Sequence, residues 1–487
     1  MVTMQESKRF ALDISMTFVA SLISMVLVYM VTVLLGRYLG PSSLGLYRMN
    51  STFYSFAMII GMMGIPAAMI KYVAESKDNK KTLYEIISSG VITSLVLGTG
   101  FVIMFYILSG PFARIFRMPE LSSLLKILSL VFPFTFVGGV LLGLLNGLRE
   151  MKQYNIALVL QSALLVIITV PLVYRGFGVT GAVIGIVLST SGYFLYLIWA
   201  SKDYLRLTFH GYISSTKKML KFGSQIFATN AIDLMSYRAD IILIGYFLTA
   251  ADVGNYTAAV GLSQFFWLIP NAIQRITYPA SSAYWAVKNH AAMQTMIDKT
   301  MKYSACIMLP IALTVEVFGE DFIIMLFGER FAQAFVPLEI LLIGTVVNGA
   351  LVRAIGSCMA GVGRPDINLK IVTFSAAVGI VLNIVLIPVM GIVGAALATT
   401  LTLMANSFLQ LFFIIRVIKV KIDFTWFGKI TVVTVLAVMA SIYLPVVRTY
   451  VTGVIVLCTY VVIILFWLLT REDRAYFMGL LREVHLL

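Results

Sequence analysis

Two stretches of sequence decide the architecture, LLGRYLGPSSLGLY at residues 34–47 and LIGYFLTAADVGNY at residues 243–256. They align at an offset of 209 residues, from residue 34 to residue 243, and both carry glycines and a tyrosine at the same places. The chain therefore contains an internal duplication. The aligned identities are Gly36 with Gly245, Gly45 with Gly254, and Tyr47 with Tyr256.

Further matches follow in the same order along both copies. Residues 113–128 resemble residues 323–341, and GFGVTGAVIG at 176–185 matches VMGIVGAALA at 389–398. Six apolar segments separate each match from its copy, and an even number of crossings returns a chain to the same side of a membrane. Parallel repeats of this kind are related by an axis along the membrane normal. The predicted limits are 1–205 for an N-terminal six-helix bundle, 206–420 for a C-terminal six-helix bundle, and 421–487 for two additional helices and a tail.

The composition requires lipid as the solvent. Of the 487 residues, 60% are hydrophobic and 12% are charged, and the mean hydropathy is +0.96. A water-soluble fold cannot hide this much apolar surface, whereas segments of about 20 apolar residues suit transmembrane helices. We count such segments from residue 12 to residue 469 and predict an all-α polytopic membrane protein with about 14 transmembrane helices.

The net charge of +14 is spread in a way that gives the orientation. Lys and Arg concentrate in the longer connections at 76–85, 201–218 and 284–302, while the opposite connections are tight turns. The positive-inside rule then predicts that these connections and both termini are cytoplasmic. Because no single polar stretch gathers the basic residues, nucleic acid is not an expected partner.

The seventh predicted span carries a polar stripe at helical spacing. Asp233, Tyr237 and Asp240 lie on one face and Arg238 flanks them. Charged side chains inside a bilayer normally face water or pair with each other. Two readings stay open: a hydrated wall that meets a substrate, or a buried ion pair of Arg238 with Asp233 or Asp240. A third role for the two carboxylates is binding of a coupling ion.

The eighth predicted span adds a second polar face, formed by Gln264, Asn271, Arg275 and Tyr278 if the helix is continuous. We take the first three of these as candidate substrate contacts. The segments GMMGIP at 61–66 and Pro270 to Pro279 predict breaks at corresponding places of the two halves, which alternating access would use.

Three more charged residues fall within predicted spans. Arg353 is a candidate substrate contact and is a possible partner of Glu316, which is also a candidate for ion coupling. Arg48 stands at the outer end of the second span, where it either lines a cavity mouth or touches headgroups. Because aligned positions of the two halves differ in charge, the second half is the one we expect to hold a phosphate.

The usual signatures of enzymes are missing from the sequence. There is no Walker A glycine loop and no spacing that supports a catalytic triad. Cys306, Cys358 and Cys458 lie in apolar runs and the three histidines have no ligand spacing, so we predict no metal site and no cofactor. The chain is therefore expected to be a transporter rather than an enzyme.

Several motifs resemble a known family. SYRADIILIGYFLTAADVGNYTAA at 236–259, MLFGERFAQAFVPLEILLIG at 325–344, CMAGVGRPDINL at 358–369 and GIVGAALATTL at 391–401 are similar to landmarks of the polysaccharide exporters. These Wzx-like oligosaccharide flippases are one branch of the multidrug, oligosaccharidyl-lipid and polysaccharide (MOP) exporter superfamily. The motifs occur in the expected order, and the resemblance covers essentially the whole chain.

The resemblance implies two pseudo-symmetric six-helix bundles around a central cavity, with two helices appended. It further implies a flippase that moves a polyprenyl diphosphate-linked oligosaccharide from the cytoplasmic to the outer leaflet of the plasma membrane by alternating access. Cationic cavity residues are thought to attract the diphosphate in such flippases, and Arg238, Arg275 and Arg353 are the candidates here. Membrane lipids and the glycan polymerase or glycosyltransferases of the same pathway are the implied partners.

Two relatives within the superfamily are the alternatives. The lipid II flippases typically carry several arginines in and around the first span, whereas this sequence runs from Asp13 to Gly36 without a charge. The drug and cation antiporters normally have twelve spans and an acidic residue within the first helix. Neither pattern is found, so the polysaccharide branch is favoured.

Overall fold

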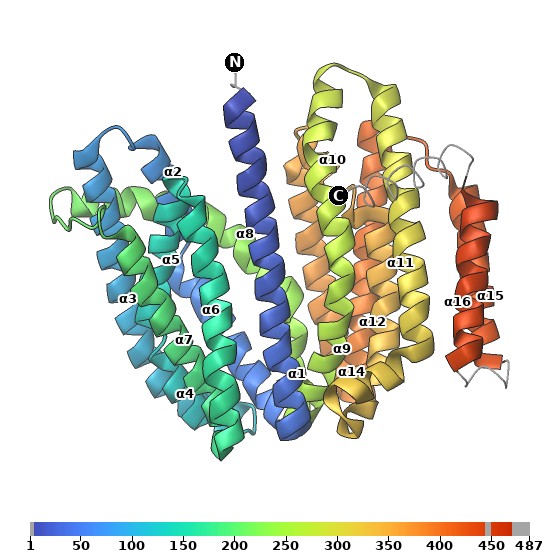
Figure 1. Ribbon diagram of the computed structural model, residues 1–487, viewed down its shortest axis with the longest axis horizontal. Coiled ribbons are helices and arrows are strands. Elements are labelled where there is room, and N and C mark those ends of the chain that lie inside the picture. Colours follow the sequence, from blue (N-terminus) through green and yellow to red (C-terminus); the bar gives the residue numbers. More distant parts are fainter. Residues whose placement is uncertain (1–3, 444–449, 470–487) are drawn as a thin grey trace. The chain divides into compact units, whose positions relative to one another are not determined.

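The computed structural model describes residues 4–443 and 450–469, and within these ranges every regular element is a helix and no strand is formed (Figure 1). The helices form two compact units. Unit 1 comprises Met1–Ala258 and Ile387–Ile392, and unit 2 comprises Ala259–Leu386 and Val393–Leu487.

Unit 1 contains the first eight long helices and the start of the ninth. Its elements are α1 Met4–Met62, α2 Ile65–Glu75, α3 Lys80–Ile115, α4 Glu120–Ser129, α5 Phe132–Gly147, α6 Met151–Leu172, η1 Val173–Phe177, α7 Gly178–Ser201, α8 Tyr212–Phe247 and the first half of α9 Ala250–Gln264.

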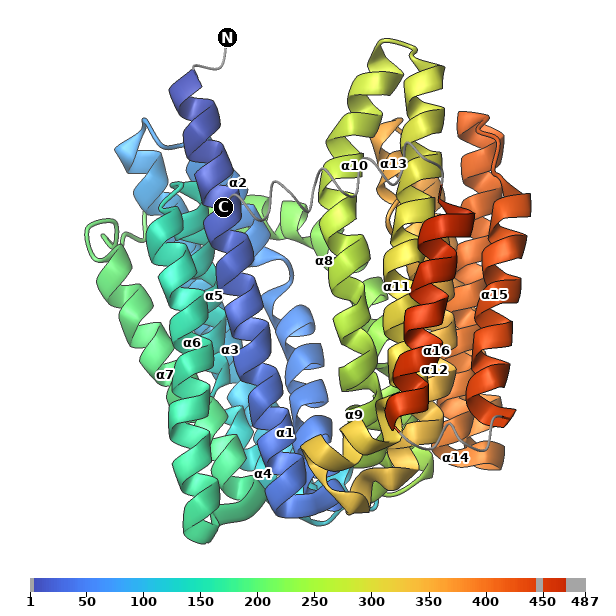
Figure 2. The ribbon, with the colours of Figure 1, turned by 45° about the vertical axis from the view of Figure 1, so that its right-hand side comes forward.

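Helix α1 is two helices joined by a turn. A straight helix of its 59 residues would extend about 88 Å, far beyond the roughly 30 Å of a bilayer core. The turn lies at Gly40, whose φ of 80° and ψ of 179° lie outside the helical region, and Pro41 follows it inside the second segment. Figure 2 shows the first segment in dark blue and the second segment returning beside it.

The break predicted in GMMGIP is confirmed. Helix α1 ends at Met62, Gly64 takes a left-handed φ of 72°, and Pro66 stands within the first two positions of α2, where its missing N–H costs nothing. A Cβ on Gly64 would lie 2.2 Å from the carbonyl oxygen of Gly223 in α8, so the small residues let the two backbones touch.

The later turn of the duplication also repeats in the backbone. Gly178, between α6 and α7, has φ 54° and ψ −140°, and its aligned counterpart Gly391 has φ 61° and ψ −140° within the long helix α14 (Pro365–Ile418). Side-chain-bearing residues avoid this conformation, so glycine is required at both places. Two positions 213 residues apart in sequence thus make the same turn.

Unit 2 holds the remaining elements. They are the end of α9, η2 Phe265–Trp267, α10 Leu268–Ala286, α11 His290–Phe327, η3 Glu329–Ala334, α12 Phe335–Asn348, η4 Gly349–Arg353, α13 Ser357–Gly361, most of α14, α15 Phe424–Tyr443, α16 Tyr450–Ile463 and η6 Ile464–Leu468.

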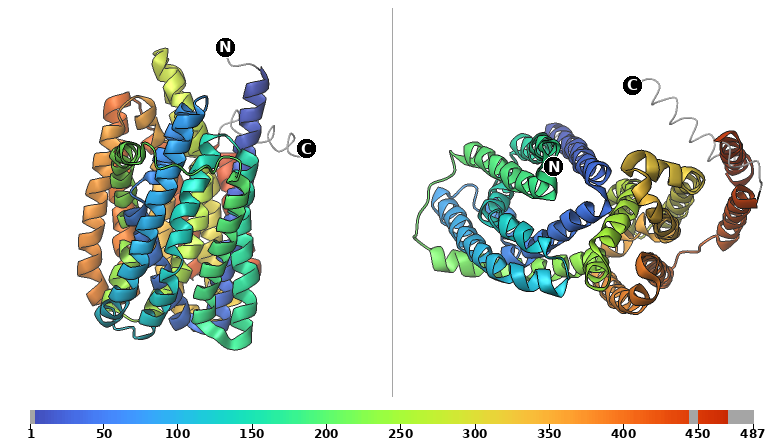
Figure 3. Two further views of the ribbon diagram at one scale, coloured as in Figure 1. Left: turned by 90° about the vertical axis from the view of Figure 1, so that its left-hand side faces the viewer. Right: turned by 90° about the horizontal axis from the view of Figure 1, so that it is seen from below.

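Five helices of the described chain are long and apolar enough to cross a membrane, or six if the bent pair α4 and α5 is one span. Three of the five contain the turns at Gly40, Gly178 and Gly391 and are longer than one crossing needs. In the right-hand view of Figure 3 the helices within each unit are seen roughly end-on. The count of about fourteen spans stays a prediction.

Contacts divide the chain differently from the duplication. Helix α8, which the duplication assigns to the second bundle, packs against α1, α2 and α3 and belongs to unit 1. The bundle limits at residues 205 and 420 describe the repeat, whereas the units describe packing. Those limits therefore remain a prediction.

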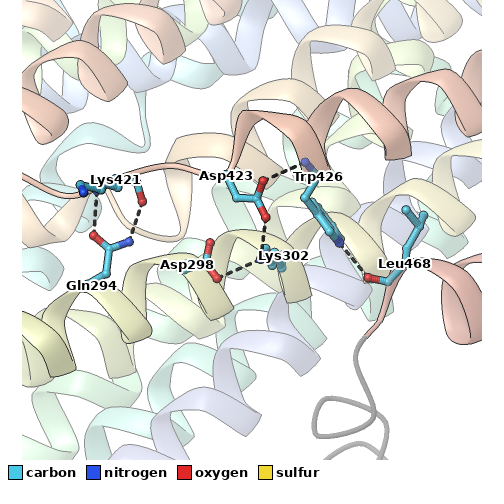
Figure 4. A network of polar contacts seen from close by, with 7 residues as sticks. All are labelled: Gln294, Asp298, Lys302, Lys421, Asp423, Trp426 and Leu468. Atoms are coloured by element: carbon cyan, nitrogen blue, oxygen red, sulfur yellow. Dashed lines mark hydrogen bonds and ion pairs between the residues drawn. The ribbon is translucent and has the colours of Figure 1, made fainter.

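Within unit 2, a polar network joins the last two helices to α11 (Figure 4). Lys302 of α11 lies 3.0 Å from Asp298 and 3.3 Å from Asp423, and Asp423 accepts a hydrogen bond from the backbone N–H of Trp426 at the start of α15. The Trp426 indole then donates to the carbonyl oxygen of Leu468, which ties α15 to the end of the α16 segment. We call Asp298, Lys302 and Asp423 the α11 clamp.

Candidate functional site

The duplicated segments contact each other through their glycines. A Cβ on Gly45 would lie 1.7 Å from the carbonyl oxygen of Ala250, and a Cβ on Gly254 would lie 1.9 Å from that of Pro41. Ala250 is the aligned counterpart of Pro41, so the contact is reciprocal, as in a two-fold interface. Only glycine permits backbones to approach so closely. The second segment of α1 and the first half of α9 are therefore held together within unit 1.

A charged group lies beside this contact between α1 and α9. Asp240 of α8 accepts a hydrogen bond from the hydroxyl of Tyr256 in α9 at 2.9 Å, and its other carboxylate oxygen accepts from the N–H of Ile241 at 2.7 Å. Arg48 of α1 and Arg238 of α8 are the cations that act on Asp240 electrostatically, and Arg48 and Arg238 act on each other. We call Arg48, Arg238, Asp240 and Tyr256 the arginine cluster.

Buried polar atoms that lack a partner occur on the helix segments that carry the arginine cluster. Within the described part of the chain, the Nε of Arg48, both side-chain atoms of Asn50 and the Oδ1 of Asn255 are buried without a hydrogen bond. Asn50 is 0% exposed. Buried polar groups in native proteins are almost always satisfied by protein, water or ligand. Asn50 and Asn255 stand within two residues of Arg48 and Tyr256 in sequence, and the Nε of Arg48 belongs to the cluster itself and keeps unused capacity for a hydrogen bond.

The cluster unites three of the predicted site residues. Arg48, Arg238 and Asp240, which are separated by up to 192 residues in sequence, lie within electrostatic range of one another and are all partly buried. No direct ion pair joins Asp240 to either arginine among the residues that the structure describes. The side chains of Asp233 and Tyr237 lie outside the described residues, so their predicted roles stay predictions.

A second polar site lies in unit 2. The Nε of Arg353, in the π-helical turn η4, donates to the Oδ1 of Asn271 in α10 at 3.2 Å. Its guanidinium also lies 5.3 Å from the centre of the Trp267 ring, within the range of a cation–π interaction. The predicted contacts Arg353 and Asn271 are therefore brought together, with an aromatic ring that a sugar face can stack on.

The polar face predicted for the eighth span is interrupted. Helix α9 ends at Gln264, the 3₁₀ turn η2 follows at Phe265–Trp267, and α10 begins at Leu268. Pro270 cannot donate the helical hydrogen bond to residue 266, which explains a break one turn before it. The 3₁₀ turn therefore separates Gln264 from Asn271, Arg275 and Tyr278, and the predicted face is not carried by one continuous helix. Gln264 and Arg275 are both exposed.

Glu316 of α11 lies close to Glu339 of α12, so that the two carboxyl groups interact, while Arg353 donates to Asn271. Two carboxyl groups held close together favour sharing of one proton. The pairing of Glu316 with Arg353 stays a prediction. Glu316 remains a candidate for proton binding, which stays a prediction.

Sequence reasoning missed four residues of these sites: Tyr256, Asn50, Trp267 and Glu339. Tyr256 had a signal, because it repeats Tyr47 of the first copy. The other three are of types that occur throughout membrane helices and carry no spacing of their own. No group of three or more metal-ligating side chains forms within the described ranges, and Cys306, Cys358 and Cys458 form no disulfide there.

Comparison with known proteins decides the family. A family model described as "Polysaccharide biosynthesis protein" matches residues 34–336, which include both copies of the glycine segment. The chain belongs to this family. The likeness to the Wzx-like branch of the MOP superfamily is thereby confirmed, and the chain is a multi-pass membrane protein.

Among its relatives, the chain is 23% identical to the probable flippase AglR of Haloferax volcanii over 82% of its own length and 81% of that protein. It is 26% identical to the probable low-salt glycan biosynthesis flippase Agl15 of the same organism, over 40% of this chain and 41% of that one. The lipopolysaccharide biosynthesis protein WzxC of Escherichia coli is 22% identical over 78% of the chain and 76% of its own length.

Solved structures share the fold. The lipid II flippase MurJ in an inward closed conformation superposes with a TM-score of 0.77 at 15% identity, covering 92% of this chain and 97% of that one. An inward-facing multidrug resistance MATE family transporter gives a TM-score of 0.69 at 16% identity, over 83% of this chain and 98% of the other. At such identities the likeness establishes the fold alone, and it is the fold of the MOP superfamily.

Proposed function

We propose that this protein is a flippase that moves a polyprenyl diphosphate-linked oligosaccharide, a precursor of a polysaccharide or surface glycan, across the cytoplasmic membrane. The family and the flippase names of its relatives support a transporter rather than an enzyme. The observation that carries the substrate class is the arginine cluster. It combines two guanidinium groups with a single carboxylate, carried by α1 and α8 of unit 1.

A diphosphate is the group that this charge pattern fits. Guanidinium groups stay charged at any depth and pair bidentately with phosphate oxygens, in hydrogen bonds about twice as strong as neutral ones. The open Nε of Arg48 and the open amide of Asn50 are donors for such oxygens. The glycan is assigned to the polar residues of the duplicated second half, namely Arg353, Asn271, Gln264, Arg275 and Tyr237.

Transport is proposed to proceed by alternating access of the two duplicated halves, residues 1–205 and 206–420, around a central cavity, with residues 421–487 appended. The glycine breaks in each half are the points at which helices bend. Both termini are proposed to face the cytoplasm because the basic connections lie on their side. Glycosyltransferases and a polymerase of the same pathway are the expected partners.

The test is flipping by the intact protein in proteoliposomes. A fluorescent polyprenyl diphosphate-linked oligosaccharide is placed in both leaflets, and the fraction accessible to a membrane-impermeant quencher is followed with time. We expect equilibration that empty liposomes lack, at a rate that falls when phosphate-binding arginines are removed. Absence of flipping with several glycan lipids would contradict the proposed function. Flipping of lipid II in preference to the oligosaccharide lipids would instead favour the lipid II alternative.

A further inference from the structure

We propose that Asp240 is a built-in counter-ion of Arg48 and Arg238. It balances their positive charge while the site is empty, and an anionic cargo takes over this role when it binds. The inference rests on the proposed function, because it concerns the diphosphate of that cargo. It assigns to Asp240 a role in setting the affinity of the site for the cargo.

The two arginines need a balancing charge. Arg238 and Asp240 stand two residues apart in α8, and Asp240 is bonded to Tyr256 of α9. The close backbone contacts at Gly45 and Gly254 hold this part of α9 against the segment of α1 that carries Arg48. Arg48, Arg238 and Asp240 are partly buried in helices that form the packed interior of unit 1. Two like charges held together away from bulk water are costly unless an opposite charge is near. One carboxylate against two guanidinium groups relieves part of that cost and leaves a net positive charge for an incoming anion.

The carboxylate of Asp240 is held back from direct contact. One oxygen is bonded to Tyr256 and the other to the N–H of Ile241, and no ion pair within 4 Å links Asp240 to Arg48 or Arg238 among the described residues. The Nε of Arg48 accordingly has no acceptor within the described chain. Asp240 therefore balances charge at a distance while the Nε of Arg48 stays open for a phosphate oxygen.

This arrangement suits a substrate that must leave as well as enter. A diphosphate supplies at least two negative charges and direct hydrogen bonds, so it replaces the weaker and more distant influence of Asp240. Once it is bound, the fixed negative charge of Asp240 repels it. A transport site must bind strongly enough to load and weakly enough to release, and Asp240 shifts the balance toward release.

The experiment measures binding and flipping separately. The purified full chain is titrated calorimetrically with inorganic pyrophosphate, and its flipping rate is measured in proteoliposomes. Asp240→Asn keeps the shape and an acceptor for Tyr256 but removes the charge. We expect it to bind pyrophosphate about tenfold more tightly than the wild type, a change of about 1.4 kcal/mol, and to flip the lipid-linked oligosaccharide more slowly because release is impeded.

Two further variants complete the design. Tyr256→Phe frees Asp240 to approach the arginines directly, so we expect weaker pyrophosphate binding, opposite in sign to the effect of Asp240→Asn. Asp321→Asn removes the same charge from an exposed position of α11 in unit 2 and should leave the affinity unchanged.

The outcomes separate this inference from the proposed function. Unchanged or weaker pyrophosphate binding by Asp240→Asn, with an unchanged melting temperature, would contradict the proposed role of Asp240 as a counter-ion. If that variant does not fold, unchanged affinity in Tyr256→Phe overturns it instead. A third outcome is that pyrophosphate binding differs between the wild type and Asp240→Asn as expected, but the wild type flips no glycan lipid. This result would support the counter-ion role of Asp240 and contradict the proposed flippase function.

Discussion

Two groups of charged side chains in this protein are built in opposite ways. In the α11 clamp, Lys302 touches both Asp298 and Asp423, and Asp423 also caps the first turn of α15 through the N–H of Trp426. In the arginine cluster, Arg48 has an Nε with no acceptor in the described chain and no ion pair within 4 Å. The clamp is complete without a ligand, whereas the cluster has donors left over.

The difference separates a structural use of charge from a binding use. The hydrogen bond from Trp426 and the charge of Lys302 lower the pKa of Asp423, and although burial opposes it, Asp298 and Asp423 raise the pKa of Lys302. Each shift means that the folded protein favours the charged form. The clamp therefore stabilises the fold at pH values between the pKa of Asp423 and the pKa of Lys302. The arginine cluster has open donors that a ligand can complete.

The largest effect is expected from removing both cations of the cluster. Arg48→Gln combined with Arg238→Gln deletes two charge-assisted contacts with the diphosphate, each worth about 1.5–3 kcal/mol, so flipping should fall at least 100-fold. Initial flipping rates in proteoliposomes at equal protein content measure this. If the double variant flips as fast as the wild type, the arginine cluster does not bind the cargo, and its use of charge does not differ from that of the clamp in the way described above.

The next effect concerns the glycine contact that brings the cluster together. Gly254→Ala puts a Cβ 1.9 Å from the carbonyl oxygen of Pro41, and overpacking of this kind costs about 1–3 kcal/mol. We expect a lower melting temperature in a thiol-reactive dye assay, and slower flipping as α1 and α9 separate. Gly100→Ala in α3 is the matched control, because nothing lies within 4 Å of its Cβ. Equal melting temperatures of the two variants would contradict the close contact.

The clamp should respond in stability and not in transport. Lys302→Met removes two partly exposed ion pairs and should cost about 1 kcal/mol, with flipping unchanged at temperatures well below unfolding. A substantial loss of flipping in this folded variant would show that the clamp is more than structural.

The pH dependence of the clamp has a definite sign. Because the pKa of Lys302 is raised, its contribution is fully present below about pH 10 and is lost as pH rises through the higher folded value. Because the pKa of Asp423 is lowered, its contribution is present above about pH 4 and is lost at lower pH. Thermal unfolding across this range should show that Lys302→Met flattens the alkaline loss of stability. An identical alkaline profile would argue against the pairing.

A smaller effect on flipping than that of the two arginines is expected at the second polar site, formed by Arg353 and Asn271. Asn271→Ala removes one hydrogen bond to Arg353, worth about 1 kcal/mol, so flipping should fall about fivefold, with the loss in apparent affinity for the glycan rather than for pyrophosphate. Substrate titrations of the flipping rate give both quantities. A loss of pyrophosphate affinity as large as that of the double arginine variant would place the anion in unit 2 as well.

Much of the fold follows from sequence because glycine and proline act locally. Gly64 and the aligned pair Gly178 and Gly391 sit at turns whose dihedral angles only glycine adopts readily, so their positions could be read without a structure. The break before Pro270 was expected near that residue, but its 3₁₀ form was not, since small changes in helical twist leave no sequence pattern.

The site was harder to predict because its members meet through packing. Arg48 and Arg238 come from opposite copies of the duplication, and their meeting depends on α8 packing on α1, which repeat boundaries do not reveal. The charge difference between the aligned halves predicts that the second half holds the phosphate. Arg238 does come from that half, yet it lies in unit 1 beside Arg48, while Arg275 is exposed.

The most direct test of the account is a cryo-electron microscopy map of the full chain with a bound polyprenyl diphosphate-linked oligosaccharide. The account predicts density for the two phosphates in contact with the guanidinium groups of Arg48 and Arg238, with the carboxylate of Asp240 outside the first contacts. Phosphate density at Arg275 or Arg353, with Arg48 and Arg238 left uncontacted, would contradict it.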